Sequence, residues 1–416
     1  MFQRTGVMVQ KIDLQKTIDL CEHLGNPQKL FKSIHVGGTN GKGSVTHMIA
    51  SIFQAAGLKV GVFTSPHYKD FRERIKINGQ FIEEQYVINF VQKTKTLQES
   101  LKPSFFELTS AMAFDYFADQ KVDIAIIEVG MGGRLDSTNI ILPLISVITN
   151  ISLDHTEYLG DTLEKIAFEK AGIIKSNTPV VVGEWHSDTY EVFEHKAKEC
   201  NASITFASKN YSIMTIYDTL EYTHYDVYKK GRCIFFNLGV NLLGNYQQNN
   251  LATALQTIDV YNSLDISLKI DNEAIRKGLS NIKAYTTFMG RWQILGKDPL
   301  IIADSAHNVG GVELVLEQLK NIRYEQLHVV FGTVKDKDPS AVLDLLPKKA
   351  KYYFAKANIP RGLDANELLE KSKEFSLNGN AFNSVIEAFI HAKKNANPKD
   401  LVLVFGSIFI VAEVLP

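Results

Sequence analysis

The sequence predicts an α/β protein with two domains: a doubly wound N-terminal domain and a smaller Rossmann-like α/β C-terminal domain. Short, almost uninterrupted apolar runs alternate with runs of helical periodicity, which is typical of parallel sheets covered by helices. A length of 416 residues exceeds that of most single domains. A shift in composition at residues 290–297 separates two series of alternating elements. We therefore place the domains at residues 1–295 and 296–416.

The N-terminal domain is expected to start with a helix and then to alternate strands with helices. Strands are predicted at residues 34–36, 58–64, 122–129, 144–151 and 179–183, and helices at residues 11–30, 45–53, 84–97, 105–118 and 163–174. Residues 68–81 are charged and end in an Asn-Gly turn, so we expect an exposed excursion that carries ligand contacts. Residues 211–238 predict a small antiparallel meander packed on the main sheet, followed by an Ala-rich helix within 242–260.

The alternation restarts in the C-terminal domain. Strands are predicted at residues 300–303, 327–331, 352–355 and 401–405, and helices at residues 312–320, 339–346, 365–374 and 384–394. These elements predict a second α/β domain with its own sheet.

Composition excludes several classes of protein. A formal net charge of -1 argues against a broad basic surface for nucleic acid. The three cysteines (Cys21, Cys200 and Cys233) are far apart and lack metal-ligand spacing, which fits a reducing compartment better than a disulfide framework. No apolar run reaches the ~18 residues of a membrane helix, and the N-terminus shows no apolar signal core. We expect a cytoplasmic protein without nucleic-acid or membrane partners.

Residues 34–44 predict a phosphate-binding loop. A strand-forming tripeptide runs into a glycine-dense turn, and an apolar-periodic helix follows. Backbone N–H groups at a helix N-terminus attract anions, and Lys42 adds a mobile positive charge for phosphate oxygens. The match is imperfect, because Val36 replaces the first glycine of the usual pattern and Gly43 replaces its Ser/Thr, with the hydroxyl one place later at Ser44. An ordinary Gly-rich turn between a strand and a helix is the alternative.

Polar residues follow three of the predicted buried strands. Ser65, Glu128 and His155 should converge on the sheet edge where the loop lies, since open α/β sheets bind ligands there. Magnesium bound to a nucleotide accepts such oxygen ligands, with His155 as the unusual member. Taken singly, His155 is an ordinary capping or hydrogen-bonding residue, and Glu128 a buried carboxylate paired with Arg134.

Two further features are ambiguous by themselves. Lys170 lies in a helix whose buried side is marked by Ile166 and Ile173, and the residues alone favour a snorkelling lysine. Residues 304–308 (DSAHN) again follow a buried strand, now in the C-terminal domain. Two polar clusters that face each other from separate domains suggest a nucleotide site completed by domain closure.

An ordered set of motifs resembles the folylpolyglutamate synthase and dihydrofolate synthase family, within the Mur ligase superfamily. The segments that carry the resemblance span almost the whole chain and are residues 35–44, 64–67, 71–75, 128–139 (EVGMGGRLDSTN), 154–156, 169–173, 290–291, 304–308 and 406–407. The shifted hydroxyl of Ser44 is part of the family pattern.

The resemblance implies an ATP- and Mg-dependent amide ligase. A folate carboxylate would attack the γ-phosphate of ATP to give an acyl phosphate and ADP, and the amino group of L-glutamate would then displace phosphate through a tetrahedral intermediate. The substrate would be a tetrahydrofolate polyglutamate, dihydropteroate or both. Implied cofactors are ATP, two Mg²⁺ ions and a monovalent cation, and the protein would be a monomer. Residues 1–295 would bind ATP and folate, and residues 296–416 would form the glutamate ligase domain.

The resemblance also assigns roles to single residues. The ATP contacts would be Asn40, Gly41, Lys42, Gly43, Ser44, Asn250, Arg291 and Asp304. The metal ligands would be Ser65, Glu128, His155 and Lys170, the last carbamylated by carbon dioxide. Carbamylation turns a cation into a carboxylate-like anion that supports a second Mg²⁺, which replaces the snorkelling interpretation. The folate wall would include Leu135, Asp136, Ser137 and Thr138, and the glutamate contacts His307 and Ser407. The catalytic residues would be Lys42, His155, Lys170 and His307.

The chain departs from the family at its N-terminus. Members carry further residues, helical in pattern, before the segment that matches residues 1–6 and borders the pterin. We therefore expect either a chain start placed late or a pterin wall that is incomplete on this side.

Two other functions compete with the folate ligase. One is a Mur-type enzyme that adds an amino acid to a cell-wall nucleotide precursor, which residues 128–139 disfavour because they resemble the folate branch. The other is a binding protein that closes on ATP without ligating anything. The presence of Glu128, His155 and Lys170 together argues against that second alternative.

Overall fold

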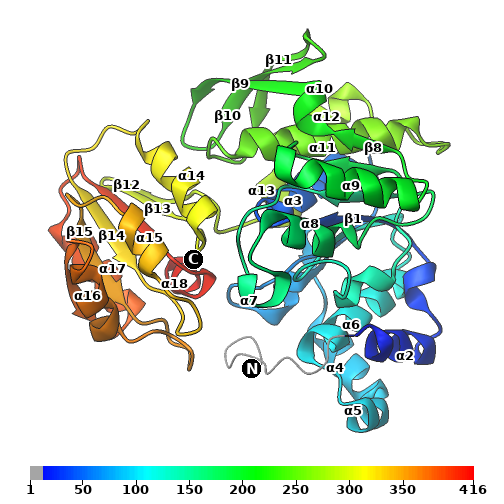
Figure 1. The fold of residues 1–416 in the computed structure, drawn as a ribbon, viewed down its shortest axis with the longest axis horizontal. Coiled ribbons are helices and arrows are strands. Elements are labelled where there is room, and N and C mark those ends of the chain that lie inside the picture. Colours follow the sequence, from blue (N-terminus) through cyan, green and yellow to red (C-terminus); the bar gives the residue numbers. More distant parts are fainter. Residues whose placement is uncertain (1–12) are drawn as a thin grey trace. The chain divides into compact units, whose positions relative to one another are not determined.

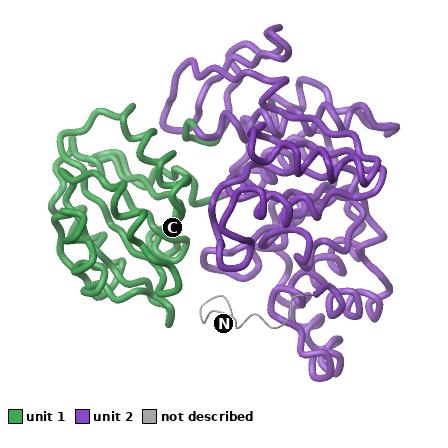
Figure 2. Tube along the Cα trace, in the orientation of Figure 1, with its two compact units in different colours: residues 1–8, 242–245, 289–416 green, residues 9–241, 246–288 purple. Residues whose placement is uncertain are grey.

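The computed structural model describes residues 13–416 and divides into two compact units. Among the described residues, unit 1 comprises 242–245 and 289–416, and unit 2 comprises the rest (Figure 2). The chain therefore passes from unit 2 to unit 1 near the boundary expected at 295/296, but residues 242–245 join unit 1 as well. The segment expected to border the pterin, residues 1–6, lies outside the described residues.

Unit 2 is built on an eight-stranded sheet with the order β4-β3-β2-β5-β1-β6-β7-β8. The strands are β1 (Lys32–Gly37), β2 (Val60–Phe63), β3 (Ile75–Ile77), β4 (Gln80–Phe81), β5 (Ile124–Glu128), β6 (Ile145–Ile148), β7 (Val180–Val182) and β8 (Ile204–Phe206). The six strands from β2 to β8 in this order pair in parallel, whereas β3 and β4 add an antiparallel edge. The predicted doubly wound sheet is confirmed, with β1 near its centre.

Helices cover this sheet, and α3 is the most deeply buried of those that carry predicted site residues. The helices are α2 (Gln15–His23), α3 (Lys42–Ala55), α4 (Glu84–Lys93), α5 (Lys95–Leu101), α6 (Phe105–Asp119), α7 (Thr156–Leu159), α8 (Leu163–Ala171), α9 (Ser187–Glu199), α10 (Ala207–Asn210), α11 (Gln247–Ser263), α12 (Asn272–Ser280) and α13 (Ile282–Thr286). Short 3-10 turns lie at Pro27–Lys29, Phe71–Arg74 and Ser137–Ile140. Helix α3 packs on the strands from one side and contacts α11, α12 and α13 (Figure 1).

The expectation of an exposed excursion at residues 68–81 is wrong. The 3-10 turn Phe71–Arg74 is followed by β3 and β4, which extend the main sheet, and Arg74, Ile75 and Lys76 are buried. The charge of this segment misled the prediction, because Arg74 and Lys76 point inward. The Asn-Gly turn exists, with positive φ at Asn78 and Gly79, which suits a tight hairpin.

The predicted meander is present as β9 (Tyr211–Asp218), β10 (Thr223–Lys229) and β11 (Arg232–Val240), all antiparallel. It contacts α11 through β9 and α12 through β11, and α11 in turn contacts β6 and β7. The meander therefore packs on a helical layer. The expectation that it packs directly on the main sheet is wrong, because α11 lies between β9 and the strands β6 and β7.

Unit 1 contains a six-stranded sheet with the order β12-β13-β17-β14-β15-β16. The strands are β12 (Gln293–Lys297), β13 (Leu300–Ala303), β14 (Leu327–Phe331), β15 (Lys351–Ala355), β16 (Asn378–Phe382) and β17 (Leu401–Phe405), and the helices are α14 (Val309–Leu319), α15 (Ser340–Leu345), α16 (Ala365–Lys373), α17 (Val385–Asn395) and α18 (Ile408–Val414). Only β12 is antiparallel to its neighbour. The four predicted strands exist, and β12, β16 and α18 are additional.

Candidate active site

The glycine loop joins β1 to α3, as predicted. Gly41 caps α3 with a φ of +83°, and a Cβ atom there would lie 2.1 Å from Oδ1 of Asn250. Asn250 donates to Oε1 of Gln247 (2.8 Å), and Gln247 donates to the Ser44 hydroxyl (3.3 Å). The structure thus brings together Gly41, Ser44 and Asn250, three of the predicted ATP contacts. Gln247, which links them, was not singled out from the sequence.

A second amide network holds Asn40, another predicted ATP contact. Its backbone N–H donates to Asn150 Oδ1 (2.9 Å), and its side chain donates to the Ser152 hydroxyl (3.1 Å). The side chains of Asn150 and Asn249 both donate to Glu184 Oε1, at 3.4 and 3.1 Å. Asn150 and Glu184 come just after β6 and β7, so the rule that found Ser65 and Glu128 could also have found them.

Two lysines converge on one carbonyl oxygen of the loop. Lys42 donates to the carbonyls of Gly38 and Thr39, each at 3.0 Å, and Lys170 donates to that of Gly38 at 2.8 Å. Lys170 is only 4% exposed, so its amine does not snorkel to solvent. Burial, helped by the nearby charge of Lys42, lowers the pKa of Lys170 to about 7, against the opposing effect of Asp154. Burial therefore favours the neutral amine form of this side chain.

Glu128 is the last residue of β5 and lies beside the loop. Its carboxylate is 5% exposed and accepts the Ser65 backbone N–H at 3.2 Å. A Cβ atom on Gly43 would lie 3.9 Å from both carboxylate oxygens, so little separates them from the start of α3. Arg134 forms its ion pair with Glu169 at 2.8 Å, which leaves the alternative of a Glu128–Arg134 pair without support.

The donors near the loop fit a hard divalent cation in type. Within residues 13–416, no group of three or more His, Cys, Asp or Glu side chains is arranged to hold a metal ion. The predicted set has only two such residues, Glu128 and His155, and requires the Ser65 hydroxyl and a carbamate on Lys170 as well. A buried carboxylate next to a phosphate-binding loop suits an ion that also takes phosphate oxygens. The metal set stays a prediction.

His155 precedes α7 in a left-handed conformation, with a φ of +50°. Its backbone N–H donates to Asp154 Oδ1 at 2.9 Å, and its side chain makes no capping hydrogen bond to α7. Capping, one part of the alternative, is therefore not supported. Its other part, an ordinary polar contact, stays open, since Nε2 of His155 lies 3.9 Å from Oδ2 of Asp154. That His155 joins Ser65 and Glu128 stays a prediction.

The predicted folate wall is a tightly bonded turn. Asp136 accepts hydrogen bonds from the backbone N–H (3.0 Å) and hydroxyl (2.5 Å) of Thr138, and from the Met131 N–H (2.9 Å). Thr138 also lies 2.8 Å from Nε2 of His35. Ser137 is buried and Leu135 is partly buried. Burial raises the pKa of Asp136, against these hydrogen bonds. Contact with folate stays a prediction for all four residues.

The predicted site residues of unit 1 gather where β13 and β17 end. Asp304 accepts the backbone N–H groups of Trp292 (2.7 Å) and Ala306 (2.9 Å). The Ser305 hydroxyl and the Arg291 guanidinium donate to the Gly290 carbonyl, at 2.9 and 3.1 Å.

His307 and Ser407 lie in the same part of unit 1. Nδ1 of His307 is 2.9 Å from the Ser305 carbonyl, and Ser407 caps α18 by accepting the Ile410 N–H at 3.2 Å. The Gly406 N–H donates to the Ala306 carbonyl at 3.2 Å, which ties the two segments together. The predicted contacts for ATP and for glutamate are thus neighbours within unit 1.

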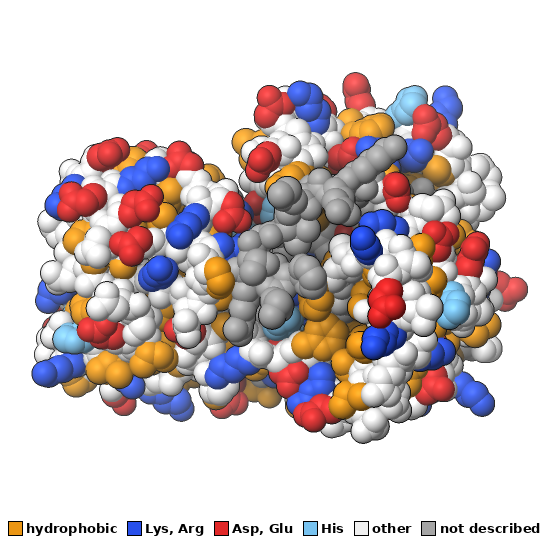
Figure 3. All heavy atoms as spheres, turned by 90° about the horizontal axis from the view of Figure 1, so that it is seen from below, with side chains coloured by type: hydrophobic (Ala, Val, Ile, Leu, Met, Phe, Trp, Pro, Cys, Tyr) orange, Lys and Arg blue, Asp and Glu red, His pale blue; other side chains and the backbone are white. Residues whose placement is uncertain are grey.

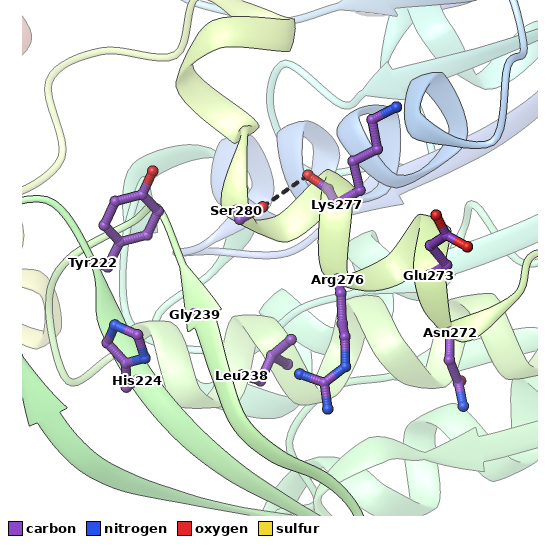
Figure 4. Close-up of a pocket in the computed structure, with 9 residues that line it drawn as sticks. All are labelled: Tyr222, His224, Leu238, Gly239, Asn272, Glu273, Arg276, Lys277 and Ser280. Atoms are coloured by element: carbon purple, nitrogen blue, oxygen red, sulfur yellow. Dashed lines mark hydrogen bonds between the residues drawn. The ribbon is translucent and has the colours of Figure 1, made fainter.

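A separate cavity of about 930 Å³ lies between the meander and α12 in unit 2. Tyr222 and His224 lie across it from Arg276 and Glu273 of α12 (Figure 4). The described residues that line it include none of the predicted site residues: they are Tyr222, His224, Leu238, Gly239, Asn272, Glu273, Arg276, Lys277 and Ser280.

The surface agrees with the near-zero net charge. On the face drawn in Figure 3, Lys and Arg side chains are interspersed with Asp and Glu side chains. Within residues 13–416, no helix is both long and apolar enough to cross a bilayer.

Comparison with known proteins gives matches over most of the chain. The Mur ligase middle domain matches residues 36–258, and the glutamate ligase domain of Mur ligases matches residues 290–408. A dihydrofolate synthase/folylpolyglutamate synthase of Bacillus subtilis is 34% identical over 97% of this chain and 94% of its own length. Escherichia coli FolC, solved in complex with DHPP and ADP, is 31% identical and superposes with a TM-score of 0.87 over 99% of this chain and 94% of its own.

Another solved bifunctional synthase holds Mn, AMPPNP and L-glutamate, and it is 31% identical with a TM-score of 0.83 over 98% of this chain and 94% of its own. A relative from Haloferax volcanii, a probable bifunctional folylpolyglutamate synthase/dihydropteroate synthase, is 33% identical over 95% of this chain. The chain spans only 47% of that relative's length, so the activity of that whole protein does not carry over.

Proposed function

Since the chain belongs to the folylpolyglutamate synthase/dihydrofolate synthase family and is an ATP-dependent ligase that adds glutamate to folates, we propose that its chemistry takes place at the glycine loop of unit 2. The convergence of Lys42 and Lys170 on the Gly38 carbonyl, with Glu128 beside Gly43, carries this proposal. Lysine side chains, a helix N-terminus and a carboxylate around one glycine loop suit a nucleoside triphosphate with its metal.

The proposed ligands are ATP, L-glutamate and a folate or dihydropteroate. Related structures hold DHPP with ADP, and AMPPNP with Mn and L-glutamate. We place Mg²⁺ in the corresponding role, and a monovalent cation, a monomeric state and a cytoplasmic location complete the proposal.

The chain's own residues would act mainly by binding and orienting. The folate carboxylate oxygen attacks the γ-phosphorus of ATP, the bond to the β,γ-bridging oxygen breaks, and ADP leaves. The glutamate amine then attacks the acyl carbon, phosphate leaves, and the nitrogen loses a proton. When bound, Mg²⁺ neutralises phosphate charge. Lys42 would exchange the Gly38 and Thr39 carbonyls for phosphate oxygens and help to hold the developing charge.

Lys170 is proposed to react with carbon dioxide. Its neutral amine forms a bond to the carbon of CO₂ and loses a proton, which leaves a carbamate anion. A pKa of about 7 supports this step, because only the neutral amine is nucleophilic. Together with Ser65, Glu128 and His155, the carbamate would complete the metal ligands.

Unit 1 is proposed to contribute Arg291 and Asp304 to ATP and His307 and Ser407 to the incoming glutamate. The bonds that join residues 290, 304–307 and 406–407 support this grouping, because they hold both sets at one end of the sheet.

Release of ADP tests the proposed reaction. We expect ADP to appear only when ATP, a pterin substrate and L-glutamate are all present, with glutamylated product in equal amount. ATP turnover that is indifferent to both partners would contradict the proposal. Comparing dihydropteroate with tetrahydrofolate polyglutamates under the same conditions decides between one substrate and two.

A further inference from the structure

A buried lysine that the proposed mechanism does not use lies behind the phosphate loop. Lys76, in the middle of β3, is only 4% exposed. Its Nζ lies 2.8 Å from the Thr286 carbonyl and 3.3 Å from each of two further atoms, the Thr287 hydroxyl oxygen and Nε2 of His47. Burying an ammonium group is costly unless its N–H groups find acceptors. Here three acceptors surround it.

The contact with His47 fixes the protonation of the imidazole. Because the ammonium group donates to Nε2, that nitrogen must carry a lone pair, and the proton lies on Nδ1. Nδ1 is 2.7 Å from the carbonyl oxygen of Gly43, to which it therefore donates. A continuous chain of hydrogen bonds runs from Lys76 through His47 to the first turn of α3. Gly43 is one of the proposed ATP contacts.

The same ammonium group also holds the end of α13. Thr286 is the last residue of this helix, and its carbonyl is among those that lack a partner within the helix. A cation at a helix C-terminus is favourable for the helix dipole as well. The hairpin that carries Lys76 approaches α13 closely, since a Cβ atom on Gly79 would lie 2.4 Å from the Tyr285 carbonyl.

The segment that follows α13 also packs on the loop directly. The ring of Phe288, two residues beyond α13, lies 4.5 Å from the His47 ring, and a Cβ atom on Gly43 would lie 3.7 Å from it. Figure 1 shows α13 beside α3. Lys76 therefore bonds both to the end of α13, two residues before Phe288, and to His47, which contacts the Gly43 carbonyl.

We propose that Lys76 is a positioning residue for ATP: through His47 it fixes the Gly43 carbonyl and thereby the orientation of the first N–H groups of α3. Loss of this link would let the start of α3 move and misalign donors that bind phosphate, without removing any of them. This inference rests on the proposed role of the loop in binding ATP.

Replacement of Lys76 tests the link. In Lys76→Met, which keeps the unbranched chain but lacks the terminal ammonium group, we expect the dissociation constant for ATP to rise about tenfold, whereas the KM values for L-glutamate and folate stay within about twofold. Lys59→Met is the matched control. Lys59 directly precedes β2, the strand that pairs with β3, and within the described residues its ammonium group donates to the Gln120 carbonyl. This control should leave all three constants unchanged.

His47→Asn probes the same link from its other end. Asparagine retains a donor near the Gly43 carbonyl but is too short to reach Lys76. It should weaken ATP binding about as much as Lys76→Met does, and the double variant should be no worse than either single variant, since both break one chain. This second variant also keeps the test decisive if Lys76→Met does not fold.

The outcomes separate the inference from the proposed function. A lower melting temperature with unchanged ATP binding in either folded variant would overturn the positioning role, as would additive effects in the double variant. Lys42→Ala, measured alongside, tests the loop itself. If Lys42→Ala leaves ATP binding intact, the proposed function fails; if only Lys42→Ala weakens it, the inference about Lys76 fails alone.

Discussion

The two groups of predicted site residues, one in each unit, are held in place by different means. Around the loop of unit 2, lysine amines donate to backbone carbonyl oxygens: Lys42 and Lys170 to that of Gly38 and, behind the loop, Lys76 to that of Thr286. In unit 1, a side-chain anion accepts backbone N–H groups, because Asp304 bonds to Trp292 and Ala306. Each unit also contains the opposite kind of contact, because Glu128 accepts the Ser65 N–H and Arg291 donates to the Gly290 carbonyl. The comparison is therefore between the lysines of unit 2 and Asp304 of unit 1.

The difference suggests separate tasks. A buried ammonium bonded to a carbonyl gains more from a phosphate or carboxylate partner, so the loop of unit 2 is arranged to respond to a charged ligand. A carboxylate with two backbone donors is already satisfied, so Asp304 is suited to fixing the backbone at 290–292 and 304–306. Substitution of the loop lysines should then lower the rate of ligation, whereas substitution of Asp304 should mainly lower the free energy of unfolding.

Lys170→Ala should have the largest effect. We expect the ligation rate to fall by at least about 10²-fold, because the residue would supply charge at the reacting phosphates, whereas ATP still binds. Measurement requires product formation and ATP binding on the same preparation. Lys165→Ala is a matched control on α8, where Lys165 is exposed and paired with Asp161, and it should be active. Near-normal ligation by Lys170→Ala would refute the carbamate role.

Lys42→Ala should come next. Because its ammonium would contact ATP before and during phosphoryl transfer, we expect affinity and turnover to fall together, each by about tenfold or more. Titration with ATP and steady-state rates check this. Lys42→Arg keeps the charge and should recover part of the loss. An effect on turnover alone would mean that Lys42 does not bind the ground state.

Asp304→Asn should act mainly on stability. An asparagine retains one acceptor oxygen, so one of the two N–H groups that Asp304 satisfies would face an NH₂ group instead. An unsatisfied buried donor costs about 1–3 kcal/mol. We expect unit 1 to unfold earlier in urea, with a smaller fractional loss of ligation than in Lys42→Ala. An unchanged midpoint of urea unfolding would mean that the hydrogen bonds of Asp304 do not stabilise unit 1.

The smallest expected effect is a pH dependence of stability, and it involves a residue outside both groups of predicted site residues. His328, in β14, is buried between Tyr353 and Asp400, and burial lowers its pKa despite the nearby carboxylate. Below the ordinary pKa near 6.5, the unfolded chain binds a proton that the folded chain does not, so stability should fall as pH drops through this range.

His328→Asn should flatten that acid dependence in thermal unfolding between pH 7 and pH 5. Ligation by His328→Asn at pH 7 should match that of the parent. His328 and Asp400 lie where β14 and β17 begin, whereas the predicted site residues of unit 1 follow the ends of β13 and β17. An equally steep acid dependence in this variant would assign the effect to other groups.

Most central elements followed from sequence patterns, because strands buried on both faces show as continuous apolar runs. The same reasoning missed β8, β12 and β16, which are edge strands with partly exposed residues and no such run. It also missed α9, whose buried side is the narrow stripe of Thr189, Phe193 and Ala197.

For the site, the rule that ligands gather at strand ends predicted that Glu128 and Ser65 lie together and that residues 304–308 form a cluster. In the structure, the Ser65 N–H donates to the Glu128 carboxylate at 3.2 Å. The sequence could not show which residues of other helices and strands contact these side chains. Lys76 and His47 are 29 residues apart and carry no shared motif, and Gln247 bonds to Ser44 only because α11 packs on α3. Such pairings depend on how helices pack, which no local pattern encodes.

The brief passage of the chain through unit 1 at residues 242–245 has a practical consequence for dissecting the protein. Leu243 is buried in the core of unit 1 with Trp292 and Phe331, and the Asn245 N–H donates to Gln318 at 2.8 Å. A fragment that begins at residue 289 would therefore lack a piece of its own interior. Chimeras that exchange the C-terminal unit with that of a relative should carry these four residues with it, since a cut at a single position divides a core.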